Sequence, residues 1–211
     1  MSSKVGLTKD LETHYNARKA DIRKRLEDFK NVRNEDYFYE LCYCLCTPQT
    51  KAKNAFEIQK ILKEKNFFNN EISNLELILN NPKHNIRFHN EKAKRLISIK
   101  NEWAIVEALL NTKVDNYTKR NWLARGIDGF GYKEASHFLR NIGYEGLAIL
   151  DRHILKMLVE CGVYNSVPDI STKAKYFEVE QKLLEFSNKI NINVDEIDLL
   201  FWSKVNGEIL K

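Results

Sequence analysis

Apolar side chains recur at helical spacing along almost the whole of this 211-residue chain. In one segment Ala135, Phe138 and Ile142 follow one another at steps of three and four residues, which places them on one face of an α-helix. No long segment alternates apolar and polar residues in the way a half-buried strand does. We therefore predict an all-α fold of about ten helices joined by short loops.

Composition agrees with this fold class. Glycine (8) and proline (3) are scarce, which disfavours many-stranded folds because these need frequent turns, and a hydrophobic fraction of 43% is enough to build a core. The predicted helices are Lys9–Phe29, Asp36–Cys46, Thr50–Lys65, Glu71–Leu79, Glu91–Lys100, Glu102–Asn111, Asn116–Arg125, Tyr132–Ile142, Asp151–Cys161, Thr172–Asn188 and Val194–Ile209.

The four cysteines are better explained as core residues than as metal ligands. Cys42, Cys44 and Cys46 alternate within a helical pattern, whereas zinc and iron–sulfur sites usually space their ligands by two or more residues. Cys161 stands far from them in the sequence. We expect all four to act as small buried hydrophobes, with no metal or other cofactor.

Charge and hydropathy indicate which kind of partner and which cellular location to expect. The 34 basic and 29 acidic residues give a net charge of +5, which is mildly basic and compatible with a polyanionic partner without being diagnostic. No apolar run is long enough for a membrane span, and Met1–Lys4 lacks the apolar stretch of a signal peptide. We expect a cytoplasmic protein that does not contact membranes.

One glycine-rich turn between two predicted helices contains candidate functional residues. Gly129 and Gly131 lie in the segment 127–133 and permit backbone angles that other residues resist, so their N–H groups are candidates for binding a phosphate. Lys133 follows in the first turn of the next helix, away from its apolar stripe. The positive end of a helix favours the neutral form of lysine, which is the nucleophilic form.

An aspartate follows at a second helix start. Asp151 lies 18 residues after Lys133, where backbone N–H groups and the helix dipole favour a carboxylate. Taken alone, Asp151 is compatible with a simple helix cap and Lys133 with a solvated surface lysine. The residues alone leave both interpretations of each side chain open, a structural one and a catalytic one.

These residues resemble the helix–hairpin–helix DNA glycosylase superfamily, in which a hairpin of the form apolar-x-Gly-apolar-Gly-x-Lys precedes a catalytic Asp. The resemblance implies that Lys133 is the Schiff-base nucleophile, Asp151 the catalytic carboxylate, and Gly129 and Gly131 part of a DNA-backbone site. Asp128 departs from the pattern, since many relatives carry proline there.

Other segments share the resemblance. Leu45–Thr50 is similar to a Leu-x-Ser-x-Gln-Thr segment, which implies that Gln49 fills the gap left by an extruded base. Arg87–Ala93 is similar to the segment with the apolar wedge, which implies that Phe88 intercalates into the duplex. The four-cysteine cluster of the endonuclease III branch has no counterpart here.

Within this superfamily, the sequence most resembles the type-2, archaeal-style 8-oxoguanine DNA glycosylases. Lys133–Asn141 and the C-terminal segment carry this likeness, which implies that Trp202 and the chain-terminal Lys211 reach the damaged-base pocket. His153 is a further candidate for contact with the DNA backbone. The roles of His89, Lys92 and Lys204 stay open.

The resemblance implies a monomeric enzyme of base-excision repair that acts on double-stranded DNA containing an oxidised purine. It would flip out 8-oxoguanine, remove it through an imine with Lys133 and cleave the abasic strand by β-elimination. Two helical lobes would flank a DNA-binding cleft, residues 34–144 forming one lobe and residues 1–33 with 145–211 the other. The alternatives are a glycosylase of this fold for another damaged base and a non-catalytic helix–hairpin–helix DNA-binding module.

Overall fold

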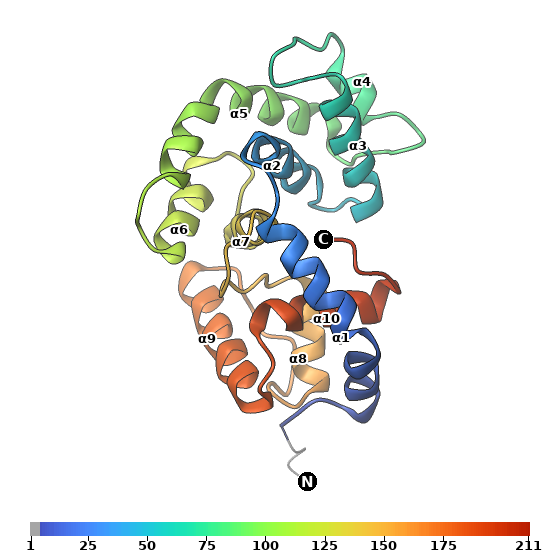
Figure 1. Ribbon diagram of the computed structural model, residues 1–211, viewed down its shortest axis with the longest axis vertical. Coiled ribbons are helices and arrows are strands. Elements are labelled where there is room, and N and C mark those ends of the chain that lie inside the picture. The colour runs from blue at the N-terminus through green and yellow to red at the C-terminus, as the bar shows by residue number, and fades with distance from the viewer. Residues whose placement is uncertain (1–4) are drawn as a thin grey trace. The chain divides into compact units, whose positions relative to one another are not determined.

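The computed structural model describes residues 5–211, and every regular element in that range is a helix (Figure 1). The all-α prediction is confirmed. The elements are α1 (Lys9–Lys30), the short 3₁₀ helix η1 (Asn34–Asp36), α2 (Tyr37–Cys46), α3 (Ala52–Glu64), α4 (Leu75–Leu79), α5 (His89–Leu110), α6 (Asn116–Gly126), α7 (Tyr132–Asn141), α8 (Arg152–Glu160), α9 (Lys173–Ile190) and α10 (Val194–Asn206).

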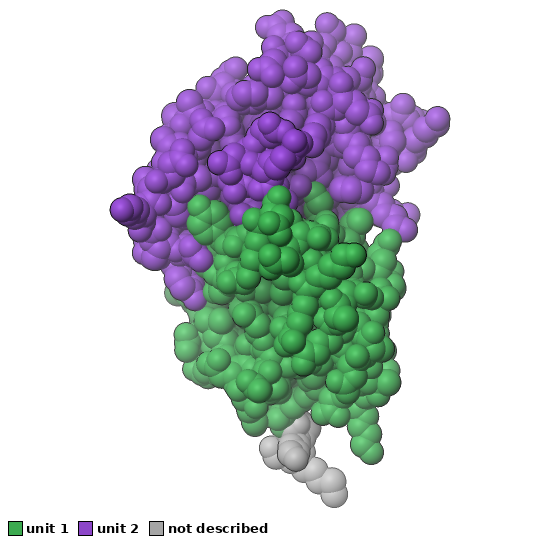
Figure 2. All heavy atoms as spheres, viewed as in Figure 1, with its two compact units in different colours: residues 1–31, 143–211 green, residues 32–142 purple. Residues whose placement is uncertain are grey.

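The chain divides into two compact units (Figure 2). One unit contains the chain up to Asn31 together with Gly143–Lys211, so its two segments come from opposite ends of the sequence. The other unit is the continuous segment Val32–Ile142. We call them the terminal unit and the middle unit.

Helix α2 is the core of the middle unit. It contacts α3, α5 and α7, and every residue from Phe38 to Cys46 is buried. The helix is therefore buried on all its faces, as expected for a helix enclosed by neighbours. Its one carboxylate, Glu40, accepts hydrogen bonds from Gln59 Nε2 at 2.8 Å and Asn141 Nδ2 at 3.1 Å.

Helix α10 has the corresponding place in the terminal unit, where it contacts α1, α8 and α9. Its residues Ile197, Leu199, Leu200 and Phe201 are fully buried. Polar contacts with α1 supplement this packing, since Lys204 Nζ lies 2.6 Å from a carboxylate oxygen of Asp10. Lys204, whose role the sequence leaves open, thus ties the last helix to the first.

Three predicted helices are corrected by the structure, two of which form a single helix. A break was expected between Lys100 and Glu102, but α5 runs through this point because no glycine or proline interrupts it and its buried positions continue at helical spacing. The helix predicted over 71–79 begins only at Leu75. Asn74 adopts a left-handed conformation (φ 59°), which an α-helix does not accommodate.

The expected burial of the cysteines is confirmed, since Cys42, Cys44, Cys46 and Cys161 are all buried and none of the four forms a disulfide. Within residues 5–211 no group of three or more His, Cys, Asp or Glu side chains is arranged to hold a metal ion. No helix in the same range is both long and apolar enough to cross a membrane. Met1–Lys4, on which the signal-peptide argument rests, lie outside the described residues.

Candidate active site

The glycine turn joins α6 to α7 as a tight hairpin in the middle unit. Gly129 has φ +77°, a backbone conformation that side chains with a Cβ atom rarely adopt, so the turn favours glycine there. Gly131 differs from the expectation, because its φ of −101° and ψ of −175° are open to any residue. Only one of the two glycines is conformationally necessary.

The N–H of Gly131 is already occupied. It donates to Oε2 of Glu134 at 3.1 Å, as in a helix cap, and is not a free anion-binding group in this structure. The other oxygen, Oε1 of Glu134, lies 3.0 Å from Nζ of Lys133. A carboxylate therefore already occupies the positive end of α7, where we expected a phosphate to bind.

Lys133 lies in the first turn of α7, as predicted. Its side chain is 26% exposed, whereas Ala135, Phe138 and Leu139 on the apolar stripe are fully buried. Packing therefore does not account for the lysine. The short distance to Glu134 fixes the position of its amino group beside the hairpin.

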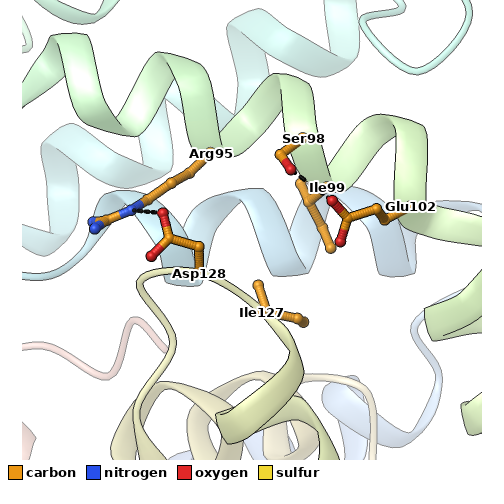
Figure 3. Close-up of a pocket in the computed structure, with 6 residues that line it drawn as sticks. All are labelled: Arg95, Ser98, Ile99, Glu102, Ile127 and Asp128. Atoms are coloured by element: carbon orange, nitrogen blue, oxygen red, sulfur yellow. Dashed lines mark hydrogen bonds and ion pairs between the residues drawn. The ribbon is translucent and has the colours of Figure 1, made fainter.

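Asp128, in the hairpin, makes an ion pair with a residue of α5 in the same unit. Its Oδ2 accepts from Nε of Arg95 on α5 at 3.0 Å (Figure 3). A small pocket next to this pair is lined by Arg95, Ser98, Ile99, Glu102, Ile127 and Asp128. The pair joins the hairpin to α5, and because the Asp128 side chain is largely exposed we expect it to contribute little to stability.

Gln49 and Phe88 share an unusual backbone conformation. Six non-glycine residues in the described range have positive φ, and four of them are asparagine, the residue that tolerates it best. The other two are Gln49 (φ 55°) and Phe88 (φ 57°). Both side chains are exposed, Phe88 to 55%. Phe88 is therefore not a core aromatic, and such strain often marks functional positions.

Asp151 is the N-cap of α8 in the terminal unit. Its Oδ1 accepts hydrogen bonds from the backbone N–H groups of His153 at 2.7 Å and Ile154 at 2.9 Å. The carboxylate is thus fixed at the positive end of the helix, as the sequence predicts, and is partly exposed. The ring of His153 lies against Arg152, whose Nε is 3.3 Å from His153 Nε2.

The C-terminal candidates also lie in the terminal unit. Trp202, on α10, is partly exposed, and Lys211 is buried. Nε of Arg25 on α1 donates to the backbone carbonyl of Leu210 at 2.7 Å. This bond fixes the segment that ends in Lys211, and sequence patterns alone did not single out Arg25.

The candidate residues thus form two groups. Gln49, Phe88, Gly129, Gly131 and Lys133 belong to the middle unit, and the terminal unit holds Asp151, His153, Trp202 and Lys211. The roles of these residues in binding DNA and in removing the damaged base stay predictions.

Comparison with known proteins decides the family. The family model described as 8-oxoguanine DNA glycosylase matches residues 22–192. The chain belongs to the 8-oxoguanine DNA glycosylase family. The 8-oxoguanine DNA glycosylase/AP lyase of Methanocaldococcus jannaschii is 38% identical over 97% of this chain and 99% of its own length. The corresponding protein of Fusobacterium nucleatum is 37% identical over 96% of each chain.

Solved structures of 8-oxoguanine DNA glycosylases share the fold. The Methanocaldococcus jannaschii glycosylase/lyase, crystallised with a 15mer DNA containing 8-oxoguanine, matches with a TM-score of 0.84 and 35% identity over 96% of this chain and 98% of that one. The Thermotoga maritima enzyme matches with a TM-score of 0.85 and 30% identity over 96% and 97%. The predicted helix–hairpin–helix glycosylase fold is confirmed.

Proposed function

We propose that this chain is a bifunctional 8-oxoguanine DNA N-glycosylase and abasic-site lyase that uses Lys133 as its nucleophile. The observation that carries the proposal is a partly exposed lysine in the first turn of the helix that follows the hairpin, in a chain of this family. A non-catalytic DNA-binding module would need the glycines but not this lysine. The presence of both Lys133 and Asp151 therefore favours the enzyme over the module.

The proposed steps of base removal follow from the chemical groups of the candidate residues. The damaged base must leave the stack before it can be reached, and Gln49 and Phe88 would fill the space that it vacates. Lys133 gives up its ammonium proton to solvent, and its neutral amine then attacks C1′ of the deoxyribose. The bond from C1′ to the base breaks, its electron pair leaves with the base, and the base takes up a proton. Asp151 stabilises the positive charge that develops on the sugar.

The same intermediate leads to strand cleavage. Ring opening converts the adduct into an imine between Lys133 and C1′, and loss of a proton from C2′ expels the 3′ phosphate by β-elimination. The chemistry needs no redox step, because the electron pairs stay within the sugar and its leaving groups. The hairpin at Gly129 and Gly131, with His153, would hold the backbone phosphates, and Glu134 would have to give up the Gly131 N–H for that glycine to contribute.

The activity is tested directly with a duplex that contains a single 8-oxoguanine. We expect release of the damaged base, strand scission and a covalent product when borohydride reduces the imine. A duplex with guanine at the same position is the control. Tight binding to the lesion with neither base release nor trapping would favour the DNA-binding module, and activity on another damaged base alone would favour the alternative glycosylase.

Deleting Lys211 should weaken discrimination between 8-oxoguanine and guanine. The two bases differ at N7 and C8, and a buried polar group left unpaired costs about 1–3 kcal/mol, so we expect a loss of about tenfold in the ratio of excision rates. Trp202 is the proposed stacking surface. Excision rates on both duplexes measure the effect, and Lys189→Gln on the exposed end of α9 is the matched control. Unaltered discrimination after the deletion would remove Lys211 from the pocket.

The setting proposed for this enzyme is chromosomal DNA in the cytoplasm of a prokaryotic cell, where it acts as a monomer. The relatives described above come from bacteria and archaea. A sedimentation or light-scattering measurement with and without DNA would test the oligomeric state.

A further inference from the structure

Lys92 is a buried lysine that the chemistry of base removal does not use. It lies on α5, its side chain is only 2% exposed, and it shares the inward face of that helix with Leu96 and Ile99. Burial lowers its pKa to about 8, with the positive charges of Arg95, Lys133 and Arg87 acting in the same direction. A buried cation is costly, so its presence at a position where an apolar side chain would pack calls for a reason.

The hydrogen bonds of Lys92 supply that reason. Its Nζ donates to the backbone carbonyl of Pro48 at 2.7 Å and to Oγ1 of Thr50 at 3.1 Å, so it holds the residues on both sides of Gln49. A third bond, at 2.8 Å, reaches the carbonyl of Cys46 at the end of α2. One amino group therefore satisfies three acceptors around a single loop.

The same residue is joined to Phe88. The backbone N–H of Lys92 donates to the carbonyl of Phe88 at 3.0 Å, which is the first helical bond of α5. The N–H of Arg87 donates to Oγ1 of Thr50 at 3.3 Å, which closes the connection from the other side. The loop of Gln49 and the start of α5 are thus bonded to each other through Lys92 and Thr50.

We propose that Lys92 is a positioning residue that holds Gln49 and Phe88 together as one preorganised wedge for entry into the duplex. The proposal rests on the proposed function for the roles of Gln49 and Phe88. Both residues have positive φ, and such conformations persist only where the surroundings enforce them. The Lys92 amino group bonds to both neighbours of Gln49, and its backbone lies in the first turn of α5, which begins after Phe88.

Lys119 offers a matched control within the same unit. It is also a buried lysine, and its Nζ donates to the backbone carbonyls of Leu109, Leu110 and Thr112 at 3.2, 2.8 and 2.6 Å. These acceptors lie at the end of α5, and neither Gln49 nor Phe88 is among them. Lys119→Met therefore removes the same kind of bonds without releasing the wedge.

The experiment compares Lys92→Met with Lys119→Met on two duplexes. One duplex contains 8-oxoguanine beside 2-aminopurine, whose fluorescence rises when stacking is lost, and the other contains a preformed abasic site, where no base needs to be unstacked. Borohydride trapping is measured on both. For Lys92→Met we expect the fluorescence change and trapping on the 8-oxoguanine duplex to slow about tenfold more than trapping at the abasic site.

Several outcomes would overturn the proposal. One is an equal loss of borohydride trapping on both duplexes for Lys92→Met, and another is no loss of trapping on either duplex. The third is the same selective loss of trapping on the 8-oxoguanine duplex for Lys119→Met. If the wild-type protein traps at the abasic site but leaves 8-oxoguanine in place, the proposed substrate fails instead. The two failures are therefore distinguishable.

A second variant covers the case in which Lys92→Met does not fold. Thr50→Val removes the hydroxyl that accepts from both Lys92 and Arg87, while it keeps the side-chain shape. We expect trapping on the 8-oxoguanine duplex to slow selectively, but by less than it does for Lys92→Met. Wild-type behaviour of Thr50→Val on both duplexes would also overturn the proposal.

Discussion

Replacing Lys133 by Gln should abolish the covalent product that borohydride traps between this protein and a duplex containing 8-oxoguanine. A glutamine amide has no lone pair available to attack C1′, so no imine forms and strand cleavage stops with it. Loss of a nucleophile in a catalytic group that acts as a unit reduces turnover on the order of 10⁶-fold. Denaturing gel electrophoresis of the trapped complex measures the effect.

The control for this variant is Lys60→Gln. Lys60 is an exposed lysine of the middle unit, and its Nζ lies 2.8 Å from Oε1 of Glu57, so it also pairs with a nearby glutamate. We expect normal trapping with Lys60→Gln and normal thermal stability with both variants. A trapped product that persists in Lys133→Gln would show that another amine is the nucleophile.

Replacing Asp151 by Asn should slow base excision by about 10²–10⁴-fold while α8 stays intact. The two roles of Asp151 separate in this variant, because asparagine caps a helix about as well as aspartate but carries no charge. Its oxygen can still accept from the N–H groups of His153 and Ile154. Single-turnover excision rates measure the catalytic loss, and thermal unfolding shows whether the cap survives.

Asp115→Asn is the matched control for charge at a helix start. Asp115 is the N-cap of α6; it accepts from the hydroxyl of Thr118 at 2.7 Å and from the N–H of Thr118 at 2.9 Å, and these bonds lower the pKa of its carboxyl. We expect excision at the wild-type rate in this variant. An equal loss of activity in both variants, or none in Asp151→Asn, would contradict a catalytic role for the Asp151 charge.

Sequence patterns predicted most helices because their signals are local. The buried stripe of α7 and the N-cap of α8 depend on residues three or four positions apart. The continuity of α5 was missed because Asn101 and Glu102 resemble a boundary, whereas the buried positions on either side of them keep one phase. The late start of α4 depends on the backbone angle of Asn74, which the pattern of apolar residues does not encode.

The candidate site was harder to predict where its contacts connect distant segments. Arg95 and Asp128 are 33 positions apart, and Lys92 reaches acceptors more than 40 positions away. A local signal did exist for two residues. Glu134 stands three positions after Gly131, as in a capping box, and Lys92 falls in register with Leu96 and Ile99 on an apolar stripe, where a charged residue is unexpected.

The buried cysteines have a consequence for a protein that works where oxidants damage DNA. Peroxides react with the thiolate form of cysteine, and access to the sulfur is also required. Burial raises the pKa of Cys46 to about 12 and that of Cys161 to about 11, and it raises the pKa of Cys42 as well. At neutral pH these sulfurs are protonated and shielded inside the helical cores, so the fold resists the same class of oxidant that creates the lesion.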